Sequence, residues 1–351
     1  MKQEKKLPVE KLKILSTHIE KSSNVCFIIG AGASRSANIP DSRELIKIIH
    51  SDHSHYVSNL DAKYHNDYGK IMSCLAPSER ETLIKDILSN AKINWGHIAL
   101  AQMMSCGYIG KVLTFNFDLI LEKASSLLGL HFPVYDFAMS PTNEINRLSS
   151  RSIIHLHGQN YGLILLNKEQ ETQEHKKAIE PIIKEAVNDH ITIIIGYGGG
   201  ADGGLEIINK EYNCRNRLFW LGYEESSPSH LSTLLEKDYT EYIGGCDFDR
   251  TMIHLCKELQ IWPPKLVDNP ITHLISELQA VANYPVDISD NSDLDVLSAT
   301  RESLTLIENK WNIQEENIDK EIFKSLTNVS ALTSNEIERY LHAYSAQSLS
   351  E

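Results

Sequence analysis

Five consecutive apolar residues, Val25 to Ile29, lead directly into the glycine-rich segment Gly30-Ala31-Gly32-Ala33-Ser34. A strand with no polar residue on either face is typical of a parallel sheet that helices cover on both sides. Glycines immediately after such a strand allow a tight turn and the close approach of another backbone or of a ligand. The two features together predict an α/β fold with an unusual loop at the end of its first strand.

Five more short apolar segments predict further strands of the same sheet. They are residues 112–117, 152–156, 191–195, 218–221 and 241–243. Stretches with helical periodicity lie between them, for example residues 81–88 and 247–259. Strands that alternate with helices in this way indicate a Rossmann-like, doubly wound parallel sheet.

Two regions depart from this alternation. Residues from about 44 to 106 have a helical pattern without a strand, which predicts a helical subdomain inserted into the α/β domain. Trp262-Pro263-Pro264 then breaks the pattern, and we expect the rest of the chain to be helical, with an acidic linker at 287–295. The chain is therefore divided into an α/β domain, residues 1–262, and a helical C-terminal region, residues 263–351.

The charge of the 351-residue chain narrows the classes of partner. There are 34 Lys and Arg against 47 Asp and Glu, a formal net charge of −13. An acidic surface repels phosphate backbones, so we expect no direct binding of nucleic acid. The apolar runs are too short to cross a bilayer, so no membrane partner is expected. No apolar segment follows the N-terminal charges, and the six cysteines include no C-x-x-C pair, which favours a cytoplasmic protein with reduced thiols.

Glycine and polar residues gather where the predicted strands end. In an open parallel sheet, ligands bind beyond the carboxyl ends of the strands. Glycines after the first strand let the backbone approach a pyrophosphate, and the N-terminus of the next helix attracts its charge. Arg35 replaces the third glycine of the dinucleotide fingerprint, so a tight structural turn is the competing interpretation of Gly30-Ala31-Gly32.

Five motifs along residues 20–260 resemble, in the same order, those of the sirtuin family. They are the glycine segment 30–34 with Ile39-Pro40-Asp41-Ser42-Arg43, Thr114-Phe115-Asn116-Phe117-Asp118, Leu156-His157-Gly158, Gly196-Tyr197-Gly198 and Gly245-Cys246-Asp247. The family counterparts are G-A-G-x-S with G-I-P-D-F-R, T-x-N-x-D, the catalytic H-G, a later nucleotide loop and a last adenine-side contact. The resemblance implies that residues 1–262 bind NAD⁺.

The chemistry of NAD⁺ cleavage explains why these residue types suit the task. Nicotinamide leaves as a neutral molecule, so the site has to stabilise an oxocarbenium-like ribose and supply a nucleophile. We expect Asn116 to bind ribose hydroxyls or position a water, and His157 to act as a base. Asp118 either orients Asn116 beside the developing cation or only caps the following helix. His155, two residues before His157, would share its face of the strand, and we do not count it in the site.

The remaining contacts follow from the resemblance. Asp41 and Arg43 would face the nicotinamide amide and the phosphates. The glycine loop 198–204 would either cradle phosphate or ribose through its N–H groups, or form a lid. The residues expected to bind the dinucleotide are Gly30, Ala31, Gly32, Ser34, Pro40, Asp41, Arg43, Thr114, Gly158, Gly196, Tyr197, Gly198, Asp247 and Phe248. No metal site is expected.

Two departures from the sirtuin deacylases favour hydrolysis of NAD⁺ over protein deacylation. The deacylases carry two C-x-x-C pairs that bind zinc, and this sequence has none, so a Cys₄ zinc site is not expected. The aromatic residue of P-D-F-R is Ser42 here, which leaves room for water beside the reactive ribose. The chain in this respect resembles the zinc-less, sirtuin-like NAD⁺ hydrolases of bacterial antiphage defence.

That resemblance implies an NAD⁺ glycohydrolase that releases nicotinamide and ADP-ribose and depletes an infected cell of NAD⁺. It also implies assembly, either as a homo-oligomer or with a companion such as a HerA-type ATPase or a nucleotide-processing enzyme. The C-terminal helices are the candidate for that contact. A non-catalytic NAD⁺ or ADP-ribose sensor and an NAD-dependent deacylase or ADP-ribosyltransferase are the alternatives, because a fold alone does not imply turnover.

Overall fold

The computed structural model describes residues 6–22, 24–159, 169–199, 203–281, 285–287, 293–295 and 298–315. The chain divides into two compact units. The larger comprises Met1–Ser126 with Leu130–Ile261, and the smaller comprises Leu127–Gly129 with Trp262–Glu351.

The larger unit is built on a parallel sheet of seven strands in the order β3-β4-β2-β1-β5-β6-β7. The strands are β1 Val25–Ile29, β2 Lys111–Thr114, β3 Val134–Asp136, β4 Ser152–His155, β5 Ile191–Ile195, β6 Leu218–Leu221 and β7 Thr240–Ile243. All neighbouring pairs are parallel, which confirms the predicted doubly wound α/β fold. The edge strand β3 was not predicted, because it has only three residues and the first of them, Val134, is exposed.

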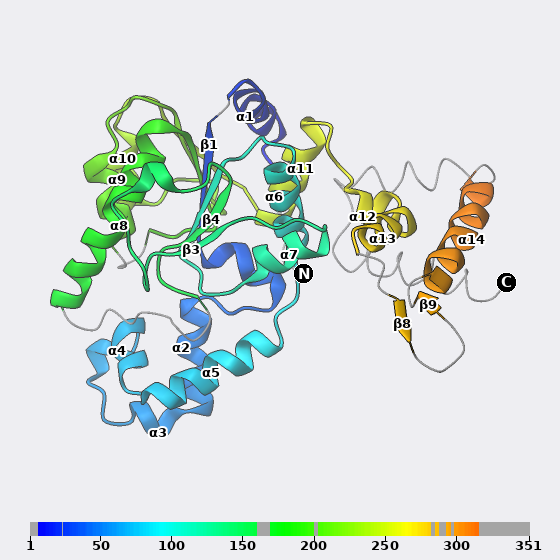
Figure 1. Ribbon diagram of the computed structural model, residues 1–351. Helices are drawn as coiled ribbons and strands as arrows, with labels where there is room; N and C mark the ends of the chain where they lie inside the picture. The colour runs from blue at the N-terminus through cyan, green and yellow to red at the C-terminus, as the bar shows by residue number, and fades with distance from the viewer. Residues whose placement is uncertain are drawn as a thin grey trace. The chain divides into compact units, whose positions relative to one another are not determined.

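Helices cover both faces of this sheet, as Figure 1 shows. One face carries α1 Val9–Lys21, α6 Trp95–Ser105 and α11 Phe248–Glu258, and the other carries α8 Glu169–Asp189, α9 Gly204–Glu211 and α10 Ser232–Leu235. Buried isoleucines of α8 belong to one apolar core with Cys26, Ile28 and Ile154 of the strands. Because side chains alternate along a strand, the residues next to Ile154 face away from α8.

The chain leaves β1 toward β2 on one side and returns to β5 on the other side. The order of the strands therefore reverses between β1 and β5. In doubly wound sheets, this reversal opens the crevice in which ligands bind. A short 3₁₀ helix, η1 Ala31–Ala37, follows β1 at this point, and α7 Ile120–Leu127 follows β2.

The helical insertion consists of α2 Ser42–Asp52, α3 Ser54–Val57, α4 Tyr68–Ser73 and α5 Pro77–Ser89. These helices have an apolar core of their own, formed by residues such as Leu45, Ile49 and Met72. The helix α6, which the predicted limits of 44–106 included, packs instead against α11 of the α/β unit. Short 3₁₀ helices complete this unit at Ala62–Tyr64, Ile145–Arg147 and Ser229–Leu231.

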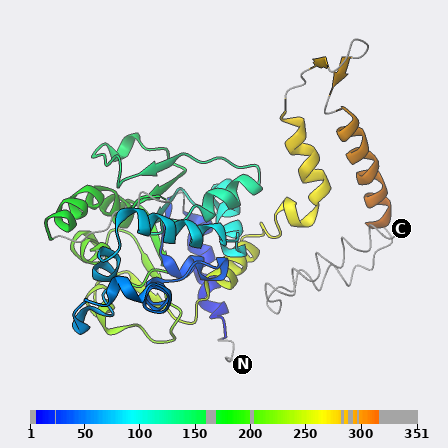
Figure 2. The same ribbon diagram turned by 90° about the horizontal axis from the view of Figure 1, so that it is seen from below.

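The smaller unit contains α12 Lys265–Asp268, α13 Pro270–Gln279 and α14 Ser298–Glu315. The helices α13 and α14 lie side by side, as both views show (Figures 1 and 2). Two short strands, β8 Pro285–Asp287 and β9 Asp293–Asp295, pair antiparallel where an acidic linker was predicted. The rest of the predicted helical region, residues 316–351, lies outside the described residues. Within the described part of the chain, no helix is long and apolar enough to span a membrane.

Candidate functional site

The order of the strands reverses between β1 and β5, and we call this place the switch point. The loops after β1 and β5 pack there, backbone against backbone. The Gly32 N–H donates to the Gly196 carbonyl oxygen at 2.8 Å, and the Gly30 N–H donates to the Ile195 oxygen at 3.3 Å. A Cβ on Gly32 would lie 2.8 Å from the Gly196 oxygen, and Gly196 itself has a φ of +67°. The close packing of the two loops requires glycine at these positions, and the contact of Gly30 and Gly32 with a dinucleotide stays a prediction. The Gly32 N–H is engaged within the protein, whereas Ala31 is exposed.

Asn116 lies directly beneath this turn. Its Nδ2 group donates to the Gly30 carbonyl oxygen at 3.2 Å and to Ser34 Oγ at 3.0 Å. Its backbone N–H donates to Thr114 Oγ1 at 3.0 Å. The Asn116 side chain is buried, with 6% of the residue exposed. The predicted residues Gly30, Ser34, Thr114 and Asn116 thus form one connected cluster.

Asp118 caps the following helix and contacts Asn116 only through Ser34. Its Oδ2 accepts a hydrogen bond from Ser34 Oγ at 2.8 Å, and its Oδ1 accepts the Ile120 N–H at 3.1 Å at the start of α7. Burial raises the pKa of the Asp118 carboxyl, although these two hydrogen bonds act in the opposite direction. Asp118 therefore caps α7 and also fixes the hydroxyl that holds Asn116.

His157 follows the carboxyl end of β4, the strand that pairs with β2. Thr114 of β2 pairs with His155 of β4, so Asn116 and His157 each lie two residues beyond a matched pair. The His157 Nδ1 atom is 2.8 Å from Nε2 of His175 on α8. His157 is 9% exposed and is followed by Gly158 with a φ of +90°. His175 was not predicted, since nothing in the sequence connects it with a residue 18 positions earlier.

An aromatic stack adjoins the two histidines. The Phe115 ring lies 5.1 Å from the His157 ring and 4.4 Å from the Tyr197 ring, to which it is nearly parallel. The Tyr197 ring lies 5.8 Å from the buried Trp220 ring of β6, in a tilted arrangement. The rings form an apolar surface that joins the end of β2 to the end of β5. Gly198 beyond Tyr197 is exposed, and Gly200 to Asp202 of the predicted glycine loop lie outside the described residues.

The structure corrects the expected position of His155. His155 is fully buried, its Nε2 atom is 2.6 Å from Glu122 Oε1 of α7, and its Nδ1 atom is 3.0 Å from the Asn116 carbonyl oxygen. His157 contacts α8 instead. The expectation that the two histidines share a face was wrong, because β4 ends at His155 and the regular alternation ends with it.

The outer predicted residues take part in other local contacts. Asp41 is the N-cap of α2 and accepts hydrogen bonds from the backbone N–H groups of Arg43 and Glu44, while the Arg43 residue is exposed. Asp247 caps α11 by accepting the Arg250 N–H. The Phe248 ring packs 5.0 Å from the His97 ring of α6. Their contacts with a dinucleotide stay predictions.

A second buried polar network, missed in the sequence, holds η1 in place. The Asn94 Nδ2 group donates to the Ala33 carbonyl oxygen at 2.8 Å and to Ser36 Oγ at 2.7 Å. Asp249 of α11 accepts the Gly96 N–H at 2.5 Å. Burial raises the pKa of Asp249 to about 6, against the lowering effect of its hydrogen bond with Ser36. Only the folded chain brings these distant segments together.

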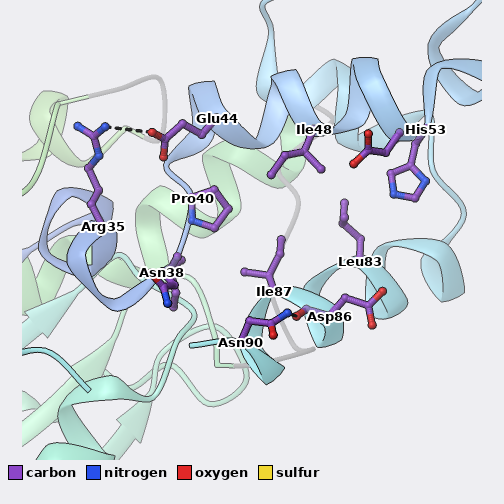
Figure 3. Close-up of a pocket in the computed structure, with 12 residues that line it drawn as sticks. Arg35, Asn38, Pro40, Glu44, Ile48, His53, Leu83, Asp86, Ile87 and Asn90 are labelled. Atoms are coloured by element: carbon purple, nitrogen blue, oxygen red, sulfur yellow. Dashed lines mark hydrogen bonds and ion pairs between the residues drawn. The ribbon is translucent and has the colours of Figure 1, made fainter. Parts of the chain in front are cut away.

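A cavity of about 590 Å³ opens between α2, α5 and the segment 35–40. Figure 3 shows Ile48, Leu83 and Ile87 facing one another across it, with Arg35 bound to Glu44 at its rim. Pro40 is the only predicted binding residue among its lining residues, which do not include Asn116 or His157.

No group of three or more histidine, cysteine or acidic side chains that could hold a metal ion is found in the described ranges. The six cysteines are free thiols.

No protein-family model matches the chain, and no curated protein does. Among solved structures, the crystal structure of a Sir2 homolog–NAD complex matches with 16% identity and a TM-score of 0.43, over 71% of this chain and 93% of that one. A sirtuin structure that addresses the structural basis of substrate affinity matches with 14% identity and a TM-score of 0.46, over 70% of this chain and 98% of that one. Sir2Tm bound to a propionylated peptide matches at 15% and 0.43, over 72% and 99%. The chain is distantly similar in structure to these proteins.

Proposed function

We propose that this chain is an NAD⁺ glycohydrolase that cleaves NAD⁺ to nicotinamide and ADP-ribose. The observation that carries the proposal is the position of Asn116 and His157, each two residues beyond the matched pair Thr114 and His155 at the carboxyl ends of the adjacent strands β2 and β4. The switch-point loops, where dinucleotides bind in doubly wound sheets, lie directly against Asn116. An amide and an imidazole at this position suit the cleavage of a bond to an anomeric carbon.

Asn116 is held in an orientation that suits a ribose or a water. Both of its amide hydrogens donate inward, to Gly30 and Ser34. The carbonyl oxygen of the amide, Oδ1, is then the atom left to accept a hydrogen bond from a ribose hydroxyl or from the attacking water. Because the amide is fixed before the substrate arrives, little reorganisation is needed during the reaction.

His157 is the proposed base, and His175 orients it. When water attacks the anomeric carbon, the bond to the nicotinamide nitrogen breaks and the ring leaves as neutral nicotinamide. The proton of the water passes to His157. The imidazolium that forms donates through Nδ1 to Nε2 of His175, 2.8 Å away. The Phe115 ring beside His157 excludes bulk water from this step.

We further propose that this hydrolysis serves bacterial antiphage defence, by depleting NAD⁺ in an infected cell. The support for this role is the motif resemblance with its missing C-x-x-C pairs and Ser42 in place of an aromatic residue. Assembly as a homo-oligomer, or with a HerA-type ATPase or a nucleotide-processing enzyme, belongs to the same proposal. Sedimentation of the full chain, alone and with such a companion, tests it.

An NAD⁺ or ADP-ribose sensor without turnover is the second candidate. The burial of both Asn116 and His157 favours it, since a ligand could occupy the switch point without reaching the two side chains. Calorimetric binding of ADP-ribose together with chromatographic detection of nicotinamide separates the two candidates. The hydrolase proposal predicts nicotinamide release in the absence of any acyl-lysine peptide. Binding without release, in the presence of the companion as well as alone, would support the sensor.

A further inference from the structure

The buried histidine His155 faces hydrogen-bond acceptors on both sides of its ring. Nδ1 lies 3.0 Å from the Asn116 carbonyl oxygen and Nε2 lies 2.6 Å from Glu122 Oε1. A carbonyl oxygen has no proton to give, and a neutral imidazole has only one N–H. With Glu122 as a carboxylate, which can only accept, both contacts are satisfied together only when each ring nitrogen carries a proton. His155 is then an imidazolium paired with Glu122.

These contacts complete a closed ring of interactions that begins and ends at Asn116, and we call this ring the circuit. The Asn116 side chain binds Ser34, Ser34 binds Asp118, and Asp118 caps α7. The helix α7 carries Glu122, which binds His155, and His155 returns to the Asn116 backbone. The side chain of Asn116 is thus fixed from the β1 loop and its backbone is fixed from β4.

The charged groups around His155 all favour its cationic form. Glu122 faces it from α7 and Asp118 from the start of the same helix. Asp136 of β3 is paired with His155 in the sheet, although Asp136 Oδ1 accepts the N–H groups of Ala138 and Met139. Burial by itself lowers the pKa of His155. The hydrogen bond and charge of Glu122, the hydrogen bond of Asn116 and the charge of Asp118 act in the opposite direction, and the pKa of His155 is raised.

We propose that His155, held as an imidazolium by Glu122, is a positioning residue that sets the backbone of Asn116 for the reaction. The proposal rests on the proposed function of Asn116. The buried carboxyl end of β4 then belongs to the site. The geometry of Asn116 depends on the protonation of His155, which does not touch the substrate.

Two variants of His155 separate its two hydrogen bonds. In His155→Asn the amide nitrogen stands near the position of Nδ1, so the donor to Asn116 is retained. In His155→Gln the amide nitrogen stands near the position of Nε2, so the donor to Glu122 is retained and the one to Asn116 is lost. The proposal predicts that His155→Gln lowers kcat about tenfold or more, as expected for a lost hydrogen bond from a charged donor, while KM changes little. His155→Asn keeps more of kcat than His155→Gln does.

Glu122→Gln tests the role of the charge. The amide oxygen still accepts from Nε2, but it no longer holds the proton on His155. The rate of this variant should fall about tenfold between pH 6 and pH 8 relative to wild type over the same interval. Glu185→Gln, which neutralises the carboxylate of the buried pair with Lys111, is the matched control and leaves the pH profile of kcat as in wild type.

Nitrogen-15 NMR of the histidine rings decides the protonation state in the unmodified chain. The signal that disappears in both His155 variants should show two protonated ring nitrogens at pH 7.5. A neutral ring at that pH, or equal kcat in wild type and His155→Gln, would overturn the proposal. If wild type releases no nicotinamide, the proposed function fails, and the NMR spectrum together with the affinity of the His155 variants for ADP-ribose still decides the role of His155.

Discussion

Two buried ion pairs lie on the same sheet, one where the strands begin (the amino edge) and one where the strands end (the carboxyl edge). The N···O distances of the two pairs are alike, but their surroundings differ. At the amino edge, Lys111 Nζ at the start of β2 is 2.6 Å from Glu185 Oε1 of α8. At the carboxyl edge, His155 Nε2 at the end of β4 is 2.6 Å from Glu122 Oε1 of α7. The basic side chain of each pair is almost fully buried, at 7% and 1% exposed.

The difference is what each pair holds. The Lys111 pair joins a strand to the helix that packs on it, and its further neighbour is His190 at 4.0 Å from Glu185. The His155 pair is hydrogen-bonded onward to Asn116, and through Ser34 and Asp118 to the loop after β1. A buried pair contributes little net stability by itself, because desolvation offsets the attraction. We infer that the Lys111 pair holds α8 against β2, and that the His155 pair holds the backbone of Asn116 in the site.

The largest effect is expected at the centre of the carboxyl-edge circuit. Asn116→Ala removes the side chain that we place beside the anomeric carbon, and it should lower nicotinamide release by about 100-fold or more. Circular dichroism should report an unchanged fold. If Asn116→Ala hydrolyses NAD⁺ at the wild-type rate, the circuit has no role in catalysis and the two edges no longer differ.

The next effect concerns the two stacked histidines. His157→Ala should abolish most of the rate, within the range of about 100-fold to 10,000-fold expected for a lost general base. His175→Phe keeps a ring in the stack but removes the acceptor for His157 Nδ1, so we expect a smaller loss, about tenfold. The ratio of kcat values of the two variants, measured at one pH, checks the order. A larger loss of kcat in His175→Phe than in His157→Ala would mean that His175 is the base and that His157 orients it.

At the amino edge the expected effect is on stability alone. Lys111→Met leaves the Glu185 carboxylate without its partner and should lower the free energy of unfolding by about 3 kcal/mol. Urea denaturation of the variant measures this loss. Nicotinamide release per folded molecule should stay within about twofold of wild type. A fall in kcat comparable with that of His155→Gln would show that both edges serve the site.

The smallest effect is a pH dependence of stability at Asp249. Burial raises its pKa from 3.8 to about 6 in the folded chain, so between these values the folded state binds more protons than the unfolded state. The free energy of unfolding therefore falls as the pH rises from 4 to 6, by about 2 kcal/mol from this group once its partial exposure is allowed for. Asp249→Asn should flatten that part of the profile in thermal melts at several pH values. An unchanged slope in the variant would remove Asp249 as its source.

Local patterns predicted the sheet well, because each apolar run specifies its own strand. The strand predicted at Ile191–Ile195 matched the structure residue by residue. The edge strand β3 was missed because three half-exposed residues make no periodic signal. Resemblance and strand ends led to Asn116, His157, Ser34 and Asp118, but the partners Glu122 and His175 could not be predicted.

Those partners depend on tertiary contacts that no local pattern contains. Glu122 and His175 lie on helices, and each has an ordinary helical environment in the sequence. The predicted orientation of His155 relative to His157 was wrong for a related reason. The prediction extended the regular alternation of side chains past His155, where β4 ends. Helix caps explain Asp41 and Asp247 in the structure, and the spacing of each to its helix was visible in the sequence.

The central claim is that Asn116 and His157 face the anomeric carbon of a dinucleotide bound at the switch point. A crystal structure of the chain with a non-hydrolysable NAD⁺ analogue measures this directly. The account predicts the C1′ atom of the nicotinamide ribose within about 4 Å of the Asn116 amide or its bound water, and on the side of the His157 ring. A dinucleotide seated elsewhere, for example in the cavity between α2 and α5, would contradict it.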